Sequence, residues 1–263
     1  MSELQFQRGA AATYEQCMGQ LSAQLVPRVL SAARLRSGLQ VLDVATGTGL
    51  VARAAAAAVG PSGHVTATDI APAMLEQAHE NLADLSNISF GIENAQGLSF
   101  GNESFDAVIC GLGIMFFPDP TRAVAEFHRV LRPGGYAAIS ANPDAARTLV
   151  LRVLVAIDRH AQSQKLRSGP VTFQGQQARL RALFETAGFR DVATAAETRT
   201  IPFPSFAAYF AAIEQGAGIA GQEYLAQSPA VRAAVRKDIR QGLNDTGGPV
   251  QVEVDITYAS GRR

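Results

Sequence analysis

Two carboxylates and two glycines are spaced as in a nucleotide-binding site. Asp43, Gly47 and Gly49 lie in VLDVATGTGLVARA (41–54), where an apolar run breaks into Thr-Gly-Thr-Gly and continues into an alanine-rich segment. Asp69 follows 20 residues after Gly49. A glycine turn between a strand and a helix lets the backbone approach a ligand closely, and a carboxylate can accept hydrogen bonds from both hydroxyls of a ribose. These residues therefore predict a site for an adenosine-containing ligand.

Asp43 bears on which ligand this is. The spacing Gly47-x-Gly49-x-x-Ala52 fits the dinucleotide fingerprint, which would indicate NAD. A pyrophosphate at this turn would however face the Asp43 carboxylate, and two negative charges at short range in a low dielectric repel strongly. S-adenosylmethionine (SAM) carries an ammonium and a sulfonium and no phosphate, so it would be attracted there. We favour SAM and keep an NAD-binding oxidoreductase as an alternative.

Strands that alternate with helices must position these residues. This alternation predicts βαβ units, a parallel sheet and helices on both of its faces. The expected strands are 40–45, 64–69, 88–93, 105–111 and 136–141, and the expected helices are 50–59, 72–83 and 119–131. Pro133-Gly134-Gly135 is expected to turn the chain into the fifth strand.

The remainder of the chain does not continue this alternation of strands and helices. We expect helices at 148–157 and 176–187, a strand at 192–201, a helical region at 202–245 and a strand at 250–260. The last two strands need not be parallel to the others. The prediction is one α/β domain over 1–263 with a Rossmann-like, seven-stranded, mostly parallel sheet. A helical lid over one end of the sheet would comprise approximately 1–37, 142–175 and 202–245.

Composition narrows the range of functions. Lys and Arg number 23, as do Asp and Glu, so the formal net charge is zero and the broad basic surface of a nucleic-acid-binding protein is not expected. Cys17 and Cys110 lie far apart and in no metal-ligand spacing, so we expect free thiols and no metal. The sequence has neither a signal-peptide pattern nor a long apolar run. We expect a cytoplasmic protein without a membrane span.

Four segments, taken in order, resemble the class I SAM-dependent methyltransferases. They are VLDVATGTG, VTATDIAPAMLEQA, FDAVIC and RVLRPGG. The resemblance is greatest to the ubiquinone/menaquinone-type branch of small-molecule methyltransferases. It covers roughly residues 10–141, together with ETAGFRDV (185–192).

The resemblance implies a role for each matching residue. Those implied to hold the methionine part of SAM are Asp43 and the backbone of Ala45, Thr46, Gly47, Thr48 and Gly49. Asp69 would bind the ribose, and Ile70 and Met74 would pack on the adenine faces. Asn94 and Ala95 would meet the adenine edge, Gly111 and Leu112 would lie under the sulfonium, and Tyr14 would close over the cofactor. Asn94 departs from the family, which has an acidic residue at this position.

The resemblance also implies an activity. We expect methyl transfer by in-line displacement to a small, fairly apolar acceptor, at carbon, oxygen or nitrogen. No catalytic residue is identified, and His160, Tyr14 and Glu214 are candidates only. A SAM-binding protein of this fold that catalyses a non-methylating reaction, such as a cyclisation, is a second alternative. The sequence does not determine the oligomeric state, and a homodimer is among the options.

Overall fold

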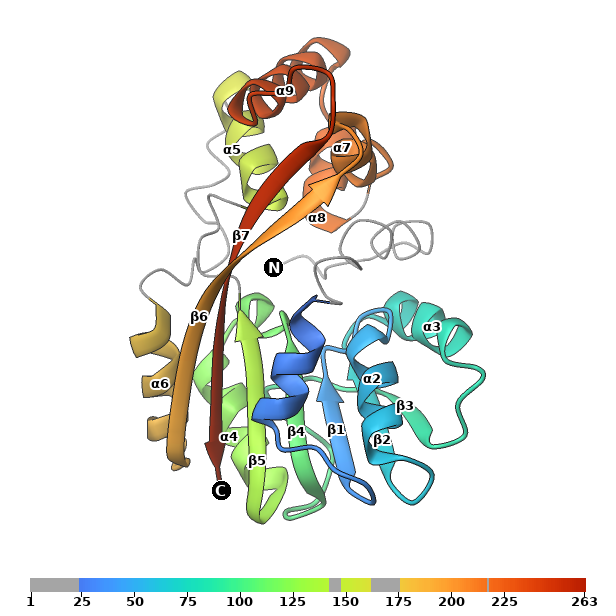
Figure 1. The fold of residues 1–263 in the computed structure, drawn as a ribbon, viewed down its shortest axis with the longest axis vertical. Coiled ribbons are helices and arrows are strands. Elements are labelled where there is room, and N and C mark those ends of the chain that lie inside the picture. Colours follow the sequence, from blue (N-terminus) through green and yellow to red (C-terminus); the bar gives the residue numbers. More distant parts are fainter. Residues whose placement is uncertain (1–23, 142–147, 162–175, 217) are drawn as a thin grey trace.

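The computed structural model describes residues 24–141, 148–161, 176–216 and 218–263 (Figure 1). Within these ranges one sheet has the strand order β3-β2-β1-β4-β5-β7-β6. Its strands are β1 (Gln40–Val44), β2 (His64–Asp69), β3 (Ile88–Ile92), β4 (Phe105–Gly111), β5 (Leu131–Ala141), β6 (Arg190–Phe203) and β7 (Val250–Arg262). Strands β1 to β5 run parallel, whereas β7 is antiparallel to β5 and β6. The predicted seven-stranded, mostly parallel α/β fold is confirmed.

The helices of the described ranges begin at residues that suit helix starts. Proline occupies the first turn of α3, α4 and α9, and the side chains of Asp119, Ser205 and Ser228 accept hydrogen bonds from the first turns of α4, α7 and α9. The helices are α2 (Leu50–Val59), α3 (Pro72–Asn81), η1 (Ile114–Phe116), α4 (Pro120–Val130), α5 (Leu149–Ala161), α6 (Gln176–Thr186), α7 (Phe206–Glu214), α8 (Gly218–Leu225) and α9 (Pro229–Gly242). The starts of α2 to α6 agree closely with those predicted, whereas η1 was not predicted and the helical region expected at 202–245 is divided into α7, α8 and α9.

The two faces of the sheet bury two separate apolar clusters. Successive strand residues point to opposite faces, so Val41 and Ile109 belong to one cluster and Leu42 and Val108 to the other. The first cluster includes α2, and the second includes α4 and α6. Because both faces are covered, the central strands β1 and β4 are mostly apolar, as is typical of a parallel sheet.

A helix at 24–32 lies on the sheet face, although the sequence placed residues 1–37 in the lid. Leu25 and Val29 are buried in the same cluster as α2. Arg28 lies over the Tyr258 ring of β7 at 5.3 Å, and Arg34 lies over the Tyr136 ring of β5 at 4.4 Å. The apolar stripe of this helix is therefore buried against the sheet, which corrects the expectation for this segment. The residues before 24 lie outside the described ranges.

Strands β6 and β7 extend beyond the sheet as a two-stranded ribbon. The pairing of β7 with β5 ends at Ala141 and Thr257, whereas its pairing with β6 continues to Phe203 and Val250. The ribbon carries α7, α8 and α9, and α5 packs against α8 and α9. Figure 1 shows this helical unit facing the carboxyl ends of the parallel strands. At the base of the ribbon the Tyr258 hydroxyl donates to Glu197 at 2.7 Å.

Strands β5 and β6 differ most from the predicted bounds. Strand β6 was expected at 192–201 and is longer at both ends, because pairing with β7 continues into the ribbon. Strand β5 was expected to begin at Tyr136 and begins at Leu131. Its register shifts between Leu131 and Tyr136, so the predicted Pro-Gly-Gly turn lies inside an irregular part of the strand.

Candidate functional site

The turn between β1 and α2 brings several backbone groups to one point. Ala45, Gly47 and Gly49 all have positive φ, at 57°, 57° and 89°. The Gly49 N–H donates to the carbonyl of Thr46 at 3.0 Å, and α2 begins with no side-chain cap. Strand order reverses between β1 and its neighbour β4, the position where open α/β sheets bind ligands. The turn that the sequence predicted to bind a ligand therefore lies at the reversal of strand order.

Gly47 and Gly49 have different surroundings. A Cβ at Gly49 would lie 2.5 Å from Leu82 Cδ1, so a side chain there would clash with the end of α3. A Cβ at Gly47 would meet no atom within 4 Å. Gly49 is thus required by packing, whereas Gly47 borders open space in which a ligand can approach the backbone.

Asp43 is fully buried beneath this turn. Its Oδ2 accepts a hydrogen bond from the Thr46 hydroxyl at 2.7 Å, and its Oδ1 has no hydrogen-bond partner among the described residues. The Asp43 pKa is raised to about 7, mainly by burial and less by the charge of Asp69, while the Thr46 hydroxyl opposes the shift. A buried carboxylate oxygen without a donor suits a cationic group such as an ammonium.

Asp69 ties the same turn to the end of β2. Its Oδ2 accepts from the Gly47 N–H at 2.9 Å, and its Oδ1 accepts from the Ala71 N–H at 3.0 Å. Burial raises its pKa above the ordinary value. Each carboxylate oxygen accepts more than one hydrogen bond, so both remain able to receive a hydroxyl. This geometry fits a ribose diol.

Apolar side chains flank Asp69 on two neighbouring strand ends. Ile70 and Ile92 are each 63% exposed, which is unusual for large apolar residues, and Ile92 pairs with Asp69 in the sheet. Met74, predicted beside Ile70 on an adenine face, is buried at 4% exposure. Ile92 was not predicted. The available signal was an apolar residue that ends an edge strand two positions before Asn94.

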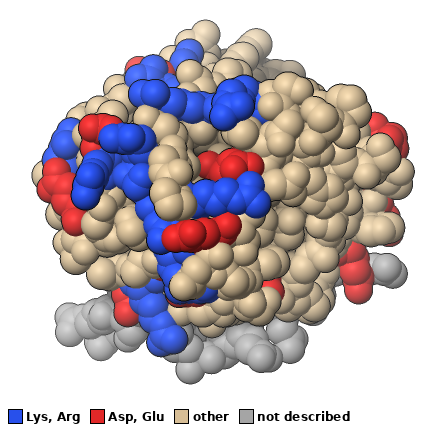
Figure 2. Space-filling model, turned by 90° about the horizontal axis from the view of Figure 1, so that it is seen from below, with Lys and Arg blue, Asp and Glu red and all other residues tan. Residues whose placement is uncertain are grey.

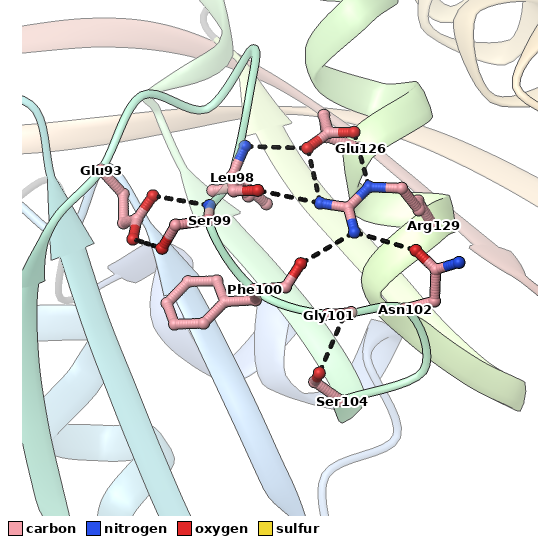
Figure 3. Close-up of polar contacts among 9 residues, drawn as sticks. All are labelled: Glu93, Leu98, Ser99, Phe100, Gly101, Asn102, Ser104, Glu126 and Arg129. Atoms are coloured by element: carbon pink, nitrogen blue, oxygen red, sulfur yellow. Dashed lines mark hydrogen bonds and ion pairs between the residues drawn. The ribbon is translucent and has the colours of Figure 1, made fainter.

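Asn94 and Ala95 lie in the segment between β3 and β4. Asn94 is exposed, and its Oδ1 accepts from the Gln96 N–H at 3.0 Å. Ala95 is buried against the second apolar cluster. Figure 3 shows that Glu126 and Arg129 of α4 bind the continuation of this segment. These two residues were not singled out from the sequence.

The end of β4 packs against the β1 turn. A Cβ at Gly111 would lie 2.8 Å from Val51 Cγ2, and one at Gly113 would lie 2.6 Å from Ala45 Cβ. Leu112 has a φ of 58°, and its N–H donates to both the carbonyl and the hydroxyl of Ser140 at 3.1 Å. The end of β4 is thus packed against the β1 turn and α2, and the place of Gly111 and Leu112 under the sulfonium stays a prediction.

Two of the candidate catalytic residues, His160 and Glu214, lie on helices of the helical unit and not on this turn. His160, on α5, contacts Asp238 of α9 at 2.8 Å, and Glu214, at the end of α7, pairs with Arg236 at 2.9 Å. Both contacts join helices within the helical unit. Tyr14 lies outside the described residues.

Two further features concern membranes and metals. None of the described helices has the length and apolarity needed to cross a bilayer. The described residues also contain no group of three or more histidine, cysteine, aspartate or glutamate side chains placed to hold a metal ion.

Comparison with known proteins finds similarity over the part of the chain that holds this site. Residues 41–135 match the model of a methyltransferase domain. Demethylmenaquinone methyltransferase of Staphylococcus aureus is 41% identical over 108 residues, which are 41% of this chain and 45% of that protein. The match therefore spans less than half the length of that relative.

Solved structures resemble the whole described fold. A Bacillus halodurans protein described as a methyltransferase has a TM-score of 0.59 at 20% identity, with 90% of this chain and 97% of that chain covered. Haemonchus contortus phosphoethanolamine N-methyltransferase 2 has a TM-score of 0.61 at 16% identity, with 97% and 57% covered. These structures support the predicted Rossmann-like fold. The predicted resemblance to SAM-dependent methyltransferases is confirmed by the sequence matches, over the residues that they cover.

Proposed function

We propose that this chain, in which residues 41–135 match the model of a methyltransferase domain, binds SAM and methylates a small apolar molecule. The observation that carries the proposal is the Asp43 carboxylate, which is fully buried and has one oxygen without a hydrogen-bond donor. An ammonium group would satisfy that oxygen, whereas a pyrophosphate would be repelled by it. This favours SAM over the alternative of NAD.

Each part of the cofactor has a chemically matched group in the chain. Asp43 and the β1 turn would hold the amino-acid part, and Asp69 would accept the ribose hydroxyls. Ile70 and Ile92 offer exposed apolar surface for the adenine ring, and the Ala95 N–H and Asn94 lie close to them in sequence and strand order. SAM, when bound, supplies a methyl group already activated by its sulfonium.

The chain's own contribution is binding, orientation and exclusion of water. Correct alignment of two reactants is worth up to about 7–11 kcal/mol in favourable cases. His160 and Glu214 already bind residues of neighbouring helices, so we assign neither as a base. A base is required only for an acceptor that must lose a proton.

The helical unit of α5 and α7–α9 is proposed as the lid that selects the acceptor. Its interior is apolar and belongs to the same cluster as one face of the sheet, through residues such as Phe206, Phe210 and Tyr224. This favours a small apolar acceptor, as does the quinone precursor in the name of the Staphylococcus aureus relative. The balanced charge of the chain argues against a nucleic acid as the methyl acceptor.

Isothermal titration with SAM, S-adenosylhomocysteine (SAH) and NAD tests the cofactor. We expect the wild-type protein to bind SAM and SAH in the micromolar range and not NAD. Asp43→Ala should lose this binding. Asp106→Asn is the matched control, because Asp106 is a carboxylate on β4 that contacts Gln40 and Arg132 rather than the turn. Binding of NAD alone would overturn the proposal.

A panel of apolar acceptors tests the reaction. Formation of SAH together with a product heavier by one methyl group is the expected result. Conversion of an acceptor without SAH formation would indicate the non-methylating alternative.

A further inference from the structure

The segment from 93 to 104 contains neither helix nor strand, although it joins two strands of the sheet. It begins with the residues proposed to meet the adenine, Asn94 and Ala95. Its backbone groups cannot be satisfied by regular secondary structure, so side chains must bind them if the segment is to hold one shape. Figure 3 shows where those side chains come from.

Arg129 of α4 donates to five acceptor atoms around this segment. Its Nη2 donates to the Leu98 carbonyl at 2.9 Å, and its Nη1 donates to the Phe100 carbonyl at 2.8 Å and to Asn102 Oδ1 at 3.0 Å. Its Nε and Nη2 also donate to the two oxygens of Glu126, at 2.7 and 2.8 Å. Five donors is the full capacity of a guanidinium.

Glu126, on the same helix, also binds this segment. Its Oε2 accepts from the Leu98 N–H at 2.8 Å, so both backbone groups of Leu98 are bound by the pair. The Leu98 side chain is buried in the cluster beneath. Arg129 holds the Glu126 pKa below its ordinary value, so the carboxylate is ionised at neutral pH. The pair therefore fixes the segment three residues beyond Ala95.

The near end of the segment has a donor with no acceptor. The Ala95 N–H donates to no other described residue, although the Ala95 residue is only 7% exposed. Asn94 bonds to Gln96, and the Gly97 N–H donates to the Asn94 carbonyl at 2.9 Å. A tight turn thus connects Ala95, whose N–H has no acceptor among the described residues, to the part of the segment that Arg129 and Glu126 bind.

We propose that Arg129, held by Glu126, is a positioning residue for adenine recognition. It touches no cofactor atom itself. It orders 98–102, and through the turn at 94–97 it fixes the Ala95 N–H and the Asn94 side chain toward the adenine edge. The inference rests on the proposed SAM site. A lysine cannot replace the arginine, because an ammonium has three donors and cannot reach all five acceptors that the planar guanidinium binds.

The test compares two ligands and two matched variants. The ligands are SAH and its deaminated analogue S-inosylhomocysteine, which lacks the adenine amino group. The variants are Arg129→Lys and the control Arg132→Lys. Arg132 bonds the Glu103 carbonyl and Asp106 rather than residues 98–102. Titration calorimetry measures all affinities, and hydrogen exchange of 98–102 reports on the segment itself.

We expect Arg129→Lys to weaken SAH binding about tenfold, the value of a hydrogen bond or two, and to weaken the inosyl analogue much less. Exchange at 98–102 should accelerate in this variant only. With an acceptor in hand, KM for SAM should rise while kcat changes little. A merely structural role would weaken both ligands equally.

The two proposals fail in different ways. A wild-type protein that binds no SAH overturns the cofactor proposal and this one with it. Wild-type binding that Arg129→Lys leaves unchanged, or weakens equally for both ligands, overturns only the role of Arg129. Should Arg129→Lys not fold, Glu126→Gln provides the same comparison, because it keeps an acceptor for Leu98 and removes the charge that holds Arg129.

Discussion

Asp43 is buried without a full set of hydrogen bonds, and this costs the folded protein free energy whenever its carboxylate is ionised. The cost appears as a pKa raised to about 7 by burial. A bound ammonium would offset the cost, because it favours the ionised form. Affinity for the cofactor and stability of the empty protein should therefore respond to pH in opposite ways.

We predict that SAH affinity falls by up to about tenfold per pH unit below pH 7, because protons then compete for Asp43. Above pH 8 the affinity should be constant. Asp43→Asn should bind weakly and without this pH dependence. Calorimetric titrations from pH 5.5 to 8.5 measure it, and a wild-type affinity independent of pH would contradict the assigned role of Asp43.

The sign for stability follows from the same shift. The Asp43 pKa is raised on folding, so its contribution to the free energy of unfolding decreases as pH rises from about 4 to about 7. Asp43→Asn should thus stabilise the empty protein at pH 8, by up to about 4 kcal/mol, and change it little at pH 4. Urea unfolding at the two pH values provides the control for the binding experiment.

The site residues that could be predicted carry a charge, or need the backbone freedom of glycine, at a fixed place in a motif. Asp43, Asp69 and the glycines are of this kind. Ile92, Arg129 and Ser140 were not predicted, because their roles depend on which strands and helices become neighbours. Arg129 follows Leu98 by 31 residues, and only the return of α4 beside the segment brings them together.

At the scale of the element, the turn from β1 to α2 combines two different glycine requirements. Both glycines have positive φ, but only Gly49 is pressed against α3, through Leu82. Gly47 borders open space. The same substitution should therefore affect stability at one position and binding at the other.

We predict that Gly49→Ala lowers the free energy of unfolding by about 2–4 kcal/mol, from the strained backbone and the contact with Leu82. Gly47→Ala should cost only about 1–2 kcal/mol and weaken SAH binding about tenfold or more, since its methyl group enters the proposed ligand space. Gly134→Ala is the control, with a φ of 85° and open space far from the site. Equal binding by Gly47→Ala and Gly134→Ala would argue against that space.

Local signals predicted the helices of the central part well, because α3 and α4 begin at a proline and α2 follows the glycine turn at 47–49. The extent of β6 and the place of the helix at 24–32 were not predictable in this way. Both depend on distant partners: β6 continues only where β7 accompanies it, and the helix at 24–32 buries Leu25 and Val29 in the apolar cluster of one sheet face. Apolar periodicity shows that a helix has a buried face, but not what covers that face.

At the scale of the whole molecule, one apolar cluster runs from the sheet into the helical unit. Val41 of β1 and Phe210 of α7 belong to it, as do Tyr209 and Tyr224. Phe210 is fully buried and contacts the rings of Phe206 and Tyr224 at centroid distances of 5.4 Å. A continuous core favours unfolding as one cooperative unit.

We predict that Phe210→Ala destabilises the sheet as well as the helical unit, by about 3–5 kcal/mol. Hydrogen exchange in intermediate urea should accelerate in peptides from β1 and from α9 to the same degree. Leu183→Ala, in the other apolar cluster, provides the comparison. Faster exchange confined to α7–α9 would show that the helical unit unfolds independently.

The position of β7 between β5 and β6 has a consequence for synthesis of the chain. Strand β6 leaves the ribosome before the helices at 206–242, yet its only partner in the described sheet is β7, which is made after them. The first five strands can associate as they emerge, while β6 waits with an unpaired edge until residue 262 is available. Helices α7–α9 form from local contacts during that interval and bring the ends of β6 and β7 together. The unit proposed to cover the acceptor therefore also makes the pairing of β6 with β7 faster, because it shortens the loop that this pairing must close.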